Sequence, residues 1–110
     1  MAAIEFEYSD HIATVTINRP EARNAMNPEV FVRLYDAFRE VESNNDIRVA
    51  IITGSGDKAF CAGADLGRLI PLMNGVRQPE DEWDNRWVNE VNKQGTYLMG
   101  RDTVKPVIAA

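Results

Sequence analysis

The chain reads Val49-Ala50-Ile51-Ile52-Thr53-Gly54-Ser55-Gly56-Asp57-Lys58-Ala59-Phe60-Cys61-Ala62-Gly63-Ala64-Asp65-Leu66 over residues 49–66. Its first four residues are apolar and mostly β-branched, which predicts a strand buried on both faces. Thr53–Asp57 closes that strand, and Leu66–Met73 is expected to form a short helix. A strand, a glycine-rich loop and a helix in this order indicate an α/β protein, in which ligands gather at the carboxyl ends of the strands.

Backbone N–H groups are the candidate functional groups of this loop. Gly63 allows the backbone to turn sharply and to approach a ligand closely, and Asp65 is a natural N-cap for the helix that follows. Free N–H groups at the start of a helix suit a carbonyl oxygen that gains negative charge during a reaction. A loop of this kind is also a common structural connection, so its residues alone leave both interpretations open.

The residues before this segment predict two strands and a helix. Apolar and polar residues alternate over Ile4–Tyr8 and over His11–Asn18, with Ser9-Asp10 between them, which indicates two strands joined by a tight turn. Asn27-Pro28-Glu29 starts a helix, with Asn as N-cap and Pro at the first helical position. The helical spacing predicts an apolar face formed by Phe31, Leu34, Tyr35, Phe38 and Val41.

The residues after it predict a second helix and a final strand. Pro79–Glu82 opens the helix, whose apolar face is formed by Trp83, Trp87, Val91 and Leu98. We expect the two tryptophans to pack in a core, with an acyl-binding pocket as the alternative. Lys105–Ala110 begins a further buried strand, at which the chain stops. Because an apolar strand without a following turn leaves an open edge, we expect residues 1–110 to be the N-terminal part of one domain without an internal boundary.

Composition excludes several classes of function. The net charge of −5 disfavours sequence-independent nucleic-acid binding, which needs clustered cations. Cys61 is the single cysteine, so the chain has no internal disulfide, and a reducing, cytoplasmic location follows. The N-terminus lacks the features of a signal peptide, and the apolar runs are too short to span a bilayer. We therefore expect a soluble protein that binds neither nucleic acid nor membrane.

Other site types are disfavoured by the residues. Cys61 as a nucleophile needs an activating base, and nothing ties it to His11, the single histidine. Glu80, Asp81, Glu82 and Asp84 lie at the start of a predicted helix, where we expect them to interact with the helix dipole and to form a solvated face, and we predict no metal site. The dinucleotide-binding motif G-x-G-x-x-G after a strand is absent from the sequence.

Four segments, in order, resemble the enoyl-CoA hydratase/isomerase (crotonase) family: Asn18–Asn27, Val49–Gly54, Lys58–Leu66 and Lys105–Ala110. The resemblance implies a ClpP/crotonase-like α/β fold, a right-handed spiral of ββα units. It also implies a lyase or isomerase of fatty-acid or related acyl-CoA metabolism. The coenzyme A thioester would be the substrate, with no covalently bound cofactor, and its carbonyl would lie in an oxyanion hole of two backbone N–H groups. The full-length family forms homo-oligomers, trimers or hexamers.

The resemblance also implies roles for individual residues. The Ala64 N–H would be the first oxyanion donor, and the Ala62 carbonyl would face the pantetheine or adenine end of coenzyme A. Glu21 replaces a lysine found in several members, so Arg23 and Lys58 become the candidate cations for a coenzyme A phosphate, with Arg68 a weaker one. The implied substrate and coenzyme A contacts are Ala22, Arg23, Ala25, Lys58, Ala62, Gly63, Asp65 and Leu66.

The remaining catalytic groups are expected beyond this sequence. In the family, the second oxyanion donor follows the strand that matches Lys105–Ala110, and the acid/base residues lie further on. The chain alone is therefore expected to be inactive. The alternative is a non-catalytic segment that self-associates or is completed by a partner chain. In the family, acyl-chain specificity is set partly by the region that matches Leu66–Val104, which shows no recognisable pattern, and the residues that determine the reaction are expected beyond Ala110.

Overall fold

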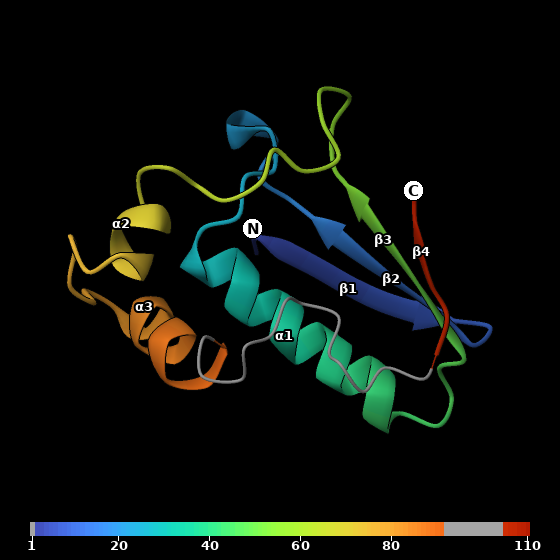
Figure 1. Cartoon of the computed structure of the whole chain (residues 1–110). Coiled ribbons are helices and arrows are strands. Elements are labelled where there is room, and N and C mark those ends of the chain that lie inside the picture. The colour runs from blue at the N-terminus through green and yellow to red at the C-terminus, as the bar shows by residue number, and fades with distance from the viewer. Residues whose placement is uncertain (1, 92–104) are drawn as a thin grey trace.

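The computed structural model describes residues 2–91 and 105–110, in which a four-stranded sheet packs against helix α1 (Figure 1). The strands, in sheet order, are β1 (Ile4–Ser9), β2 (Ile12–Ile17), β3 (Val49–Gly54) and β4 (Val107–Ala109). The helices are the 3-10 turn η1 (Pro20–Ala22), α1 (Pro28–Ser43), α2 (Ile70–Met73) and α3 (Glu82–Arg86), which continues as the π-helical turn η2 (Trp87–Val91). No helix in these two stretches is long and apolar enough to cross a membrane.

Strands β1 and β2 form an antiparallel hairpin, as the alternating pattern predicts. Its turn consists of Asp10 and His11, both with positive φ (52° and 70°). Such a turn matches the twist of the two strands, and it is one residue later than predicted because Ser9 pairs with Ile12. The alternation then buries Ala13, Val15 and Ile17 on the side that faces α1.

Helix α1 begins where the Asn27-Pro28-Glu29 motif predicts. The Asn27 side chain accepts a hydrogen bond from the Val30 N–H (2.9 Å), and Pro28 is the first helical residue. The buried surface of α1 is wider than the predicted stripe and also includes Val30 and Val32. The reason is that α1 lies between two clusters, one against the sheet and one against α2 and α3.

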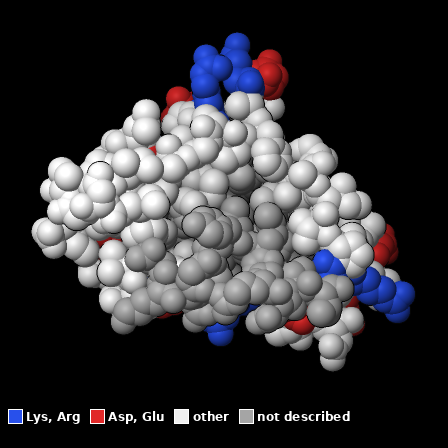
Figure 2. Space-filling view, in the orientation of Figure 1, with Lys and Arg blue, Asp and Glu red and all other residues white. Residues whose placement is uncertain are grey.

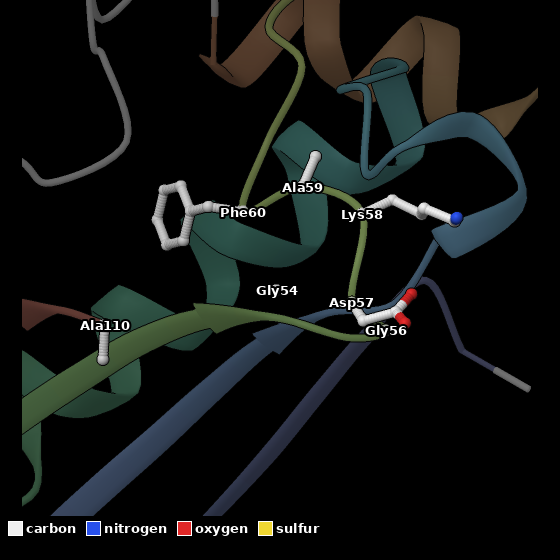
Figure 3. A pocket seen from close by; sticks show the side chains of 7 residues that line it. All are labelled: Gly54, Gly56, Asp57, Lys58, Ala59, Phe60 and Ala110. Atoms are coloured by element: carbon white, nitrogen blue, oxygen red, sulfur yellow. The ribbon is translucent and has the colours of Figure 1, made fainter.

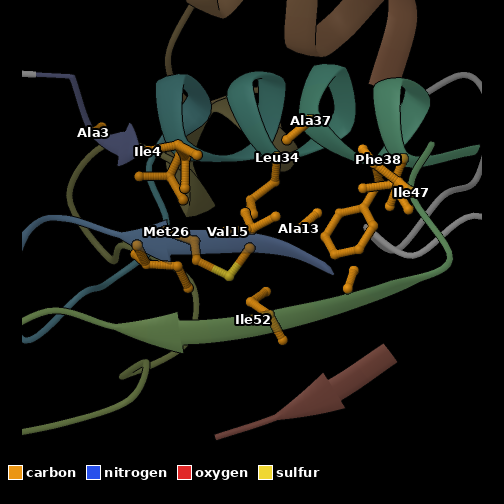
Figure 4. Close-up of a cluster of buried hydrophobic side chains, with 14 residues drawn as sticks. Ala3, Ile4, Ala13, Val15, Met26, Leu34, Ala37, Phe38, Ile47 and Ile52 are labelled. Atoms are coloured by element: carbon orange, nitrogen blue, oxygen red, sulfur yellow. The ribbon is translucent and has the colours of Figure 1, made fainter. Parts of the chain in front are cut away.

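The cluster between α1 and the sheet is the larger core (Figure 4). Leu34, Ala37 and Phe38 point from α1 toward Ala13 and Val15 of β2 and toward β3. Buried apolar side chains contribute about 1.5–3 kcal/mol each to the free energy of unfolding. The core therefore fixes the sheet against α1, and with it the loops at the carboxyl ends of β2 and β3.

Strand β3 is parallel to β2 and β4, but its burial differs from the prediction. Ala50 and Ile52 are buried under α1, whereas Val49 and Ile51 are half-buried. The prediction of a strand buried on both faces is wrong for the described residues, because α1 covers one face of the sheet only. The prediction of a buried last strand is wrong as well: β4 lies at the sheet edge, with Ile108 53% exposed.

Helix α2 is shorter than the predicted helix over residues 66–73. Residues 66–69 form a turn, and the helix proper begins at Ile70. Asp65 does not cap α2. Its carboxylate instead accepts hydrogen bonds from the N–H groups of Gly67 and Arg68 (2.8 Å each), which fixes the turn before the helix.

The second cluster contains most of the predicted tryptophan face. Trp87 and Val91 are buried together with Val32, Leu69 and Leu72. Core packing is therefore confirmed for Trp87 and Val91. Trp83 is half-buried and lies under the Arg33 guanidinium, whose Cζ is 4.6 Å from the centroid of the Trp83 ring. Leu98 lies outside the described residues.

The acidic run at the start of α3 is only partly a solvated face. Asp81 is the N-cap of α3 and accepts a hydrogen bond from the Asp84 N–H (2.8 Å). Asp84 itself is 1% exposed, and its carboxylate accepts hydrogen bonds from both terminal nitrogens of Arg77 (2.6 and 3.1 Å). These hydrogen bonds lower the pKa of the Asp84 carboxyl although burial raises it. The prediction of a solvated carboxylate is wrong at this position, because Arg77, in the loop before α3, forms an ion pair with it. The described part of the chain holds no group of side chains suited to a metal ion.

Lys105 connects β4 to the end of α1. Its Nζ donates to the carbonyl oxygens of Val41 (2.6 Å) and Asn44 (2.9 Å). The last carbonyls of a helix lack intrahelical partners and carry the negative end of the dipole, so an ammonium group is stabilising there. Lys105 thereby sets where β4 enters the sheet.

Replacing Lys105 with Met keeps the side-chain length and removes the ammonium group. We expect the free energy of unfolding to fall by about 1–2 kcal/mol. Amide exchange should accelerate at Ala50 and Ala110, whose N–H groups bond to the carbonyls of Pro106 and Ile52 across β3 and β4. Lys58→Met, at an exposed lysine, is the matched control. Equal exchange in both variants would rule out this role.

Candidate active-site loop

Two segments that are distant in sequence, residues 23–26 and 62–65, run side by side. Met26 and Ala64 form a parallel β-bridge, in which the Met26 N–H donates to Gly63 O (2.8 Å) and the Asp65 N–H donates to Met26 O (3.0 Å). The Ala62 N–H also donates to Arg23 O (3.1 Å). In such a ladder, the residue between two bonded neighbours directs its own N–H away from the partner strand.

The Ala64 N–H is consequently left without an acceptor among the described residues. Ala64 is also exposed, and its neighbour Gly63 has a φ of +97°. No heavy atom lies within 4 Å of a Cβ built on Gly63, so glycine is required there by conformation and not by space. Within residues 2–91 and 105–110, the loop therefore holds an unpaired donor at an exposed residue, on a backbone fixed by its neighbours.

Asn24 joins the two loops that surround this donor. It is fully buried, with a φ of +59°. Its Nδ2 donates to the carbonyl oxygens of Ser55 (3.0 Å) and Ala59 (2.8 Å), and its Oδ1 accepts from the Arg19 N–H (2.9 Å). The side chain replaces backbone partners that neither loop has on its own.

Gly54 makes room for this contact at the end of β3. A Cβ on Gly54 would lie 2.2 Å from Phe60 O and 2.7 Å from Asn24 Nδ2. Glycine is thus required here by close approach. The chain after β3 folds back over Gly54, which brings Phe60 above the end of the strand.

Arg19 and Asp65 form the second link between the loops. Arg19 Nη1 donates to Asp65 Oδ2 (3.2 Å) and to Ala25 O (2.7 Å), and both side chains are less than one-fifth exposed. Burial raises the pKa of the Asp65 carboxyl, but hydrogen bonds from the Arg68 N–H, the Arg19 side chain and the Gly67 N–H together lower it below the ordinary value. The pair therefore stabilises the fold above the ordinary carboxyl pKa, and its contribution is lost as the pH falls through the lowered value.

A hollow of about 320 Å³ lies beside these loops (Figure 3). It is lined by the loop after β3, from Gly54 to Phe60, and by Ala110 at the end of β4. The Phe60 ring points to the side on which Ala110 lies, whereas the Asp57 and Lys58 side chains extend away on the opposite side. The ends of two parallel strands thus frame one cavity, as expected for an α/β sheet.

Charged side chains gather at the tip of these loops. Basic and acidic groups project together at the end of the molecule where η1 and the loop after β3 lie (Figure 2). Arg23 and Lys58 are both exposed, and a Cβ on Gly56 would lie 3.2 Å from Pro20 Cβ, so the two loops touch. Arg68, the weaker candidate, pairs with Glu80 (3.0 Å).

The structure brings most of the predicted site residues onto these two adjoining segments. They are Arg23 and Ala25 on one segment, preceded by Ala22 at the end of η1, with Ala62, Gly63, Ala64 and Asp65 on the other. Leu66 follows and is 82% exposed, and Lys58 lies outside both segments, on the loop after β3. Cys61 is half-buried, and its Sγ accepts from the Gly63 N–H (3.4 Å). His11 bonds through Nδ1 to Asp46 O (2.8 Å), far along the sheet from this loop.

Sequence reasoning missed the structural roles of Arg19 and Asn24. The sequence offers one local signal for Asn24, because Asn tolerates the positive φ found there better than most residues do. Nothing in the sequence pairs position 24 with positions 55 and 59, or position 19 with position 65.

A family model described as Enoyl-CoA hydratase/isomerase matches residues 7–110. The chain belongs to the enoyl-CoA hydratase/isomerase family. It is 44% identical over 68 residues to the (E)-benzylidenesuccinyl-CoA hydratase of Thauera aromatica, an alignment that covers 62% of this chain and 27% of that protein. The family segment described here corresponds to the N-terminal portion of such relatives.

Solved structures agree with this assignment. An enoyl-CoA hydratase from Mycobacterium tuberculosis H37Rv aligns with a TM-score of 0.72 and 34% identity, over 100% of this chain and 38% of that chain. The carnitinyl-CoA hydratase from Mycobacterium avium aligns with a TM-score of 0.68 and 31% identity, over 99% of this chain and 38% of that chain. The predicted crotonase-like α/β fold class is confirmed for the part of the fold that this family segment covers.

Replacing Asn24 with Asp tests the link between the loops. Asp keeps the shape and the acceptor but removes both Nδ2 donors, and it sets a carboxylate against two carbonyl oxygens. Because buried groups would then be unsatisfied, we expect the free energy of unfolding to fall by about 2–4 kcal/mol in urea denaturation. Asn45→Asp, at an exposed asparagine, should change it by less than about 0.5 kcal/mol. Equal stability of the two variants would refute the role of Asn24.

Proposed function

We propose that this chain forms part of the active site of an acyl-CoA thioester-processing enzyme, in which the Ala64 N–H donates to the thioester carbonyl oxygen. The observation that carries the proposal is the Met26–Ala64 bridge, which leaves that N–H exposed and unpaired among the described residues. The relatives reported above are named (E)-benzylidenesuccinyl-CoA hydratase, carnitinyl-CoA hydratase and enoyl-CoA hydratase.

The proposed chemistry uses a fixed backbone dipole. Attack on, or deprotonation of, a thioester places negative charge on its carbonyl oxygen, and a donor held in position before the reaction stabilises that charge. The hydrogen bonds around Met26, Asn24 and Asp65 hold the Ala64 backbone, so little reorganisation is needed. Hydration and double-bond isomerisation both benefit from such a donor, and the acid/base groups decide between a lyase and an isomerase.

The remaining predicted contacts would bind other parts of coenzyme A. Ala62 is exposed like Ala64, and its carbonyl would meet the pantetheine or adenine end, while Ala22 and Ala25 would line the adenosine. Arg23 and Lys58, at the loop tip, would attract the phosphates. Gly63 and Leu66 adjoin the donor and would lie against the thioester end of the substrate.

The described residues offer one oxyanion donor and no free acid/base group beside it. Asp65 is the carboxylate adjacent to Ala64, and both of its oxygens already accept hydrogen bonds. We therefore propose that the 110-residue chain binds CoA ligands without useful turnover. Removal of one oxyanion donor costs about 10²–10³ in rate, and loss of a general acid or base about 10²–10⁴.

The alternative function is that of a non-catalytic segment that associates with a copy of itself or with a completing chain. The observation that favours it is strand β4, whose outer edge is unpaired among the described residues and whose Ile108 is exposed. The single-domain organisation, the homo-oligomer and the cytoplasmic location remain predictions.

A calorimetric titration with coenzyme A and with a 2-enoyl-CoA separates these functions. We expect binding of both ligands without measurable hydration, and affinity reduced by about two- to fivefold in each of Arg23→Met and Lys58→Met. Arg48→Met, at an exposed arginine of the other end of β3, is the matched control. A stable oligomer in light scattering without CoA affinity would instead support the alternative. Turnover at a rate typical of an intact enzyme would overturn the proposed inactivity.

A further inference from the structure

We propose that Arg19 is a positioning residue that holds the Ala64 N–H in place through Ala25 and Asp65. The proposal rests on the proposed function of Ala64 as an oxyanion donor. Arg19 does not touch the bridge itself. It binds one residue next to the bridge on each side, Ala25 on the first segment and Asp65 on the second.

The geometry of Arg19 directs its donors inward. A single nitrogen, Nη1, lies 2.7 Å from Ala25 O and 3.2 Å from Asp65 Oδ2, and the side chain is 18% exposed. Its Nε lies 4.0 Å from the Glu21 carboxylate. These contacts favour a structural link over direct capture of a substrate phosphate, for which Arg23 and Lys58 are better exposed.

Asp65 passes this restraint to the backbone that follows Ala64. Its Oδ2 accepts from Arg19, while its Oδ1 accepts from the N–H groups of Gly67 and Arg68. The backbone beyond is also fixed, because Arg68 O accepts a hydrogen bond from Arg77, which is bound in turn by the buried carboxylate of Asp84. Loss of Arg19 would remove the hydrogen bond to Asp65, next to Ala64, and would leave the contacts of Arg77 with Arg68 and Asp84 intact.

A guanidinium is better suited to this task than an ammonium. Arg presents five N–H donors in a planar arrangement, so one group satisfies a carbonyl and a carboxylate with fixed directions. Lys carries a point charge on a flexible chain, and we expect Arg19→Lys to restore the contact only in part.

The test is native-state amide exchange, read at Met26 and Asp65, whose N–H groups form the bridge. In Arg19→Met and in Asp65→Asn we expect exchange at both amides to accelerate by about tenfold or more, with core amides such as that of Val15 unchanged. Arg19→Lys should lie between wild type and Arg19→Met. The double variant should exchange no faster than the faster single variant, since the two residues act through one contact.

The matched control is the pair Arg33–Glu29, an ion pair of 2.7 Å on α1 outside the loops. Arg33→Met and Glu29→Gln should leave the Met26 and Asp65 amides unchanged. Unchanged exchange in Arg19→Met, or equal acceleration in the control variants, would overturn the proposal. If Arg19→Met does not fold, Arg19→Lys and Asp65→Asn carry the same comparison.

A second readout distinguishes positioning from the proposed function. The carbonyl stretch of a bound acyl-CoA falls in frequency when an oxyanion donor polarises it, and we expect a smaller fall in Arg19→Met than in wild type. Faster exchange at the bridge together with this smaller fall supports the proposal. If binding to the wild-type chain does not lower the carbonyl frequency of the acyl-CoA, the proposed function of Ala64 is contradicted. If Arg19→Met exchanges faster at the bridge but lowers the carbonyl frequency as much as wild type does, positioning by Arg19 is contradicted.

Discussion

The backbone pairing of Met26 with Ala64 depends on two hydrogen bonds, Met26 N–H to Gly63 O and Asp65 N–H to Met26 O. They join a segment that precedes α1 to a segment that follows β3. Because they use the Gly63 carbonyl and the Asp65 N–H on either side of Ala64, they leave the Ala64 N–H without a partner in the described part of the chain. The same pairing explains the positive φ of Gly63, since the chain must turn there to bring Ala64 beside Met26.

Polar side chains hold this pairing, and the apolar core holds those side chains. Asn24 and Arg19 replace the hydrogen bonds that two irregular loops lack, and a buried polar group of this kind is stabilising only when every partner is in place. The loops in turn start from elements fixed by α1: β2 ends just before Asn18, and β3 ends at Gly54. Each loop therefore begins at a strand of the packed sheet and leads to a helix, from β2 to α1 in the first loop and from β3 to α2 in the second.

Local signals in the sequence predicted the elements whose structure is determined locally. Asn27-Pro28 started α1 at the predicted residue, because capping involves only the first turn. The prediction was wrong where a contact outside the element decides the outcome. Asp84 forms an ion pair with Arg77 of the preceding loop, and the exposure of Ile51 and Ile108 depends on what lies across the sheet. The family motifs led to Ala64, Gly63 and their neighbours, whereas the contacts of Arg19 with Asp65 and of Asn24 with Ser55 and Ala59 span 31 to 46 residues and follow no sequence pattern.

The most direct measurement is the nuclear magnetic resonance signal of the Ala64 amide during titration with an acyl-CoA. If Ala64 is the oxyanion donor, its proton should move downfield on binding and its exchange with solvent should slow, because the free N–H gains an acceptor. The amide of Ile17, in the buried core, should remain unchanged. Saturable binding of the ligand that leaves the Ala64 signal and its exchange rate unaltered would contradict the central role assigned to this residue.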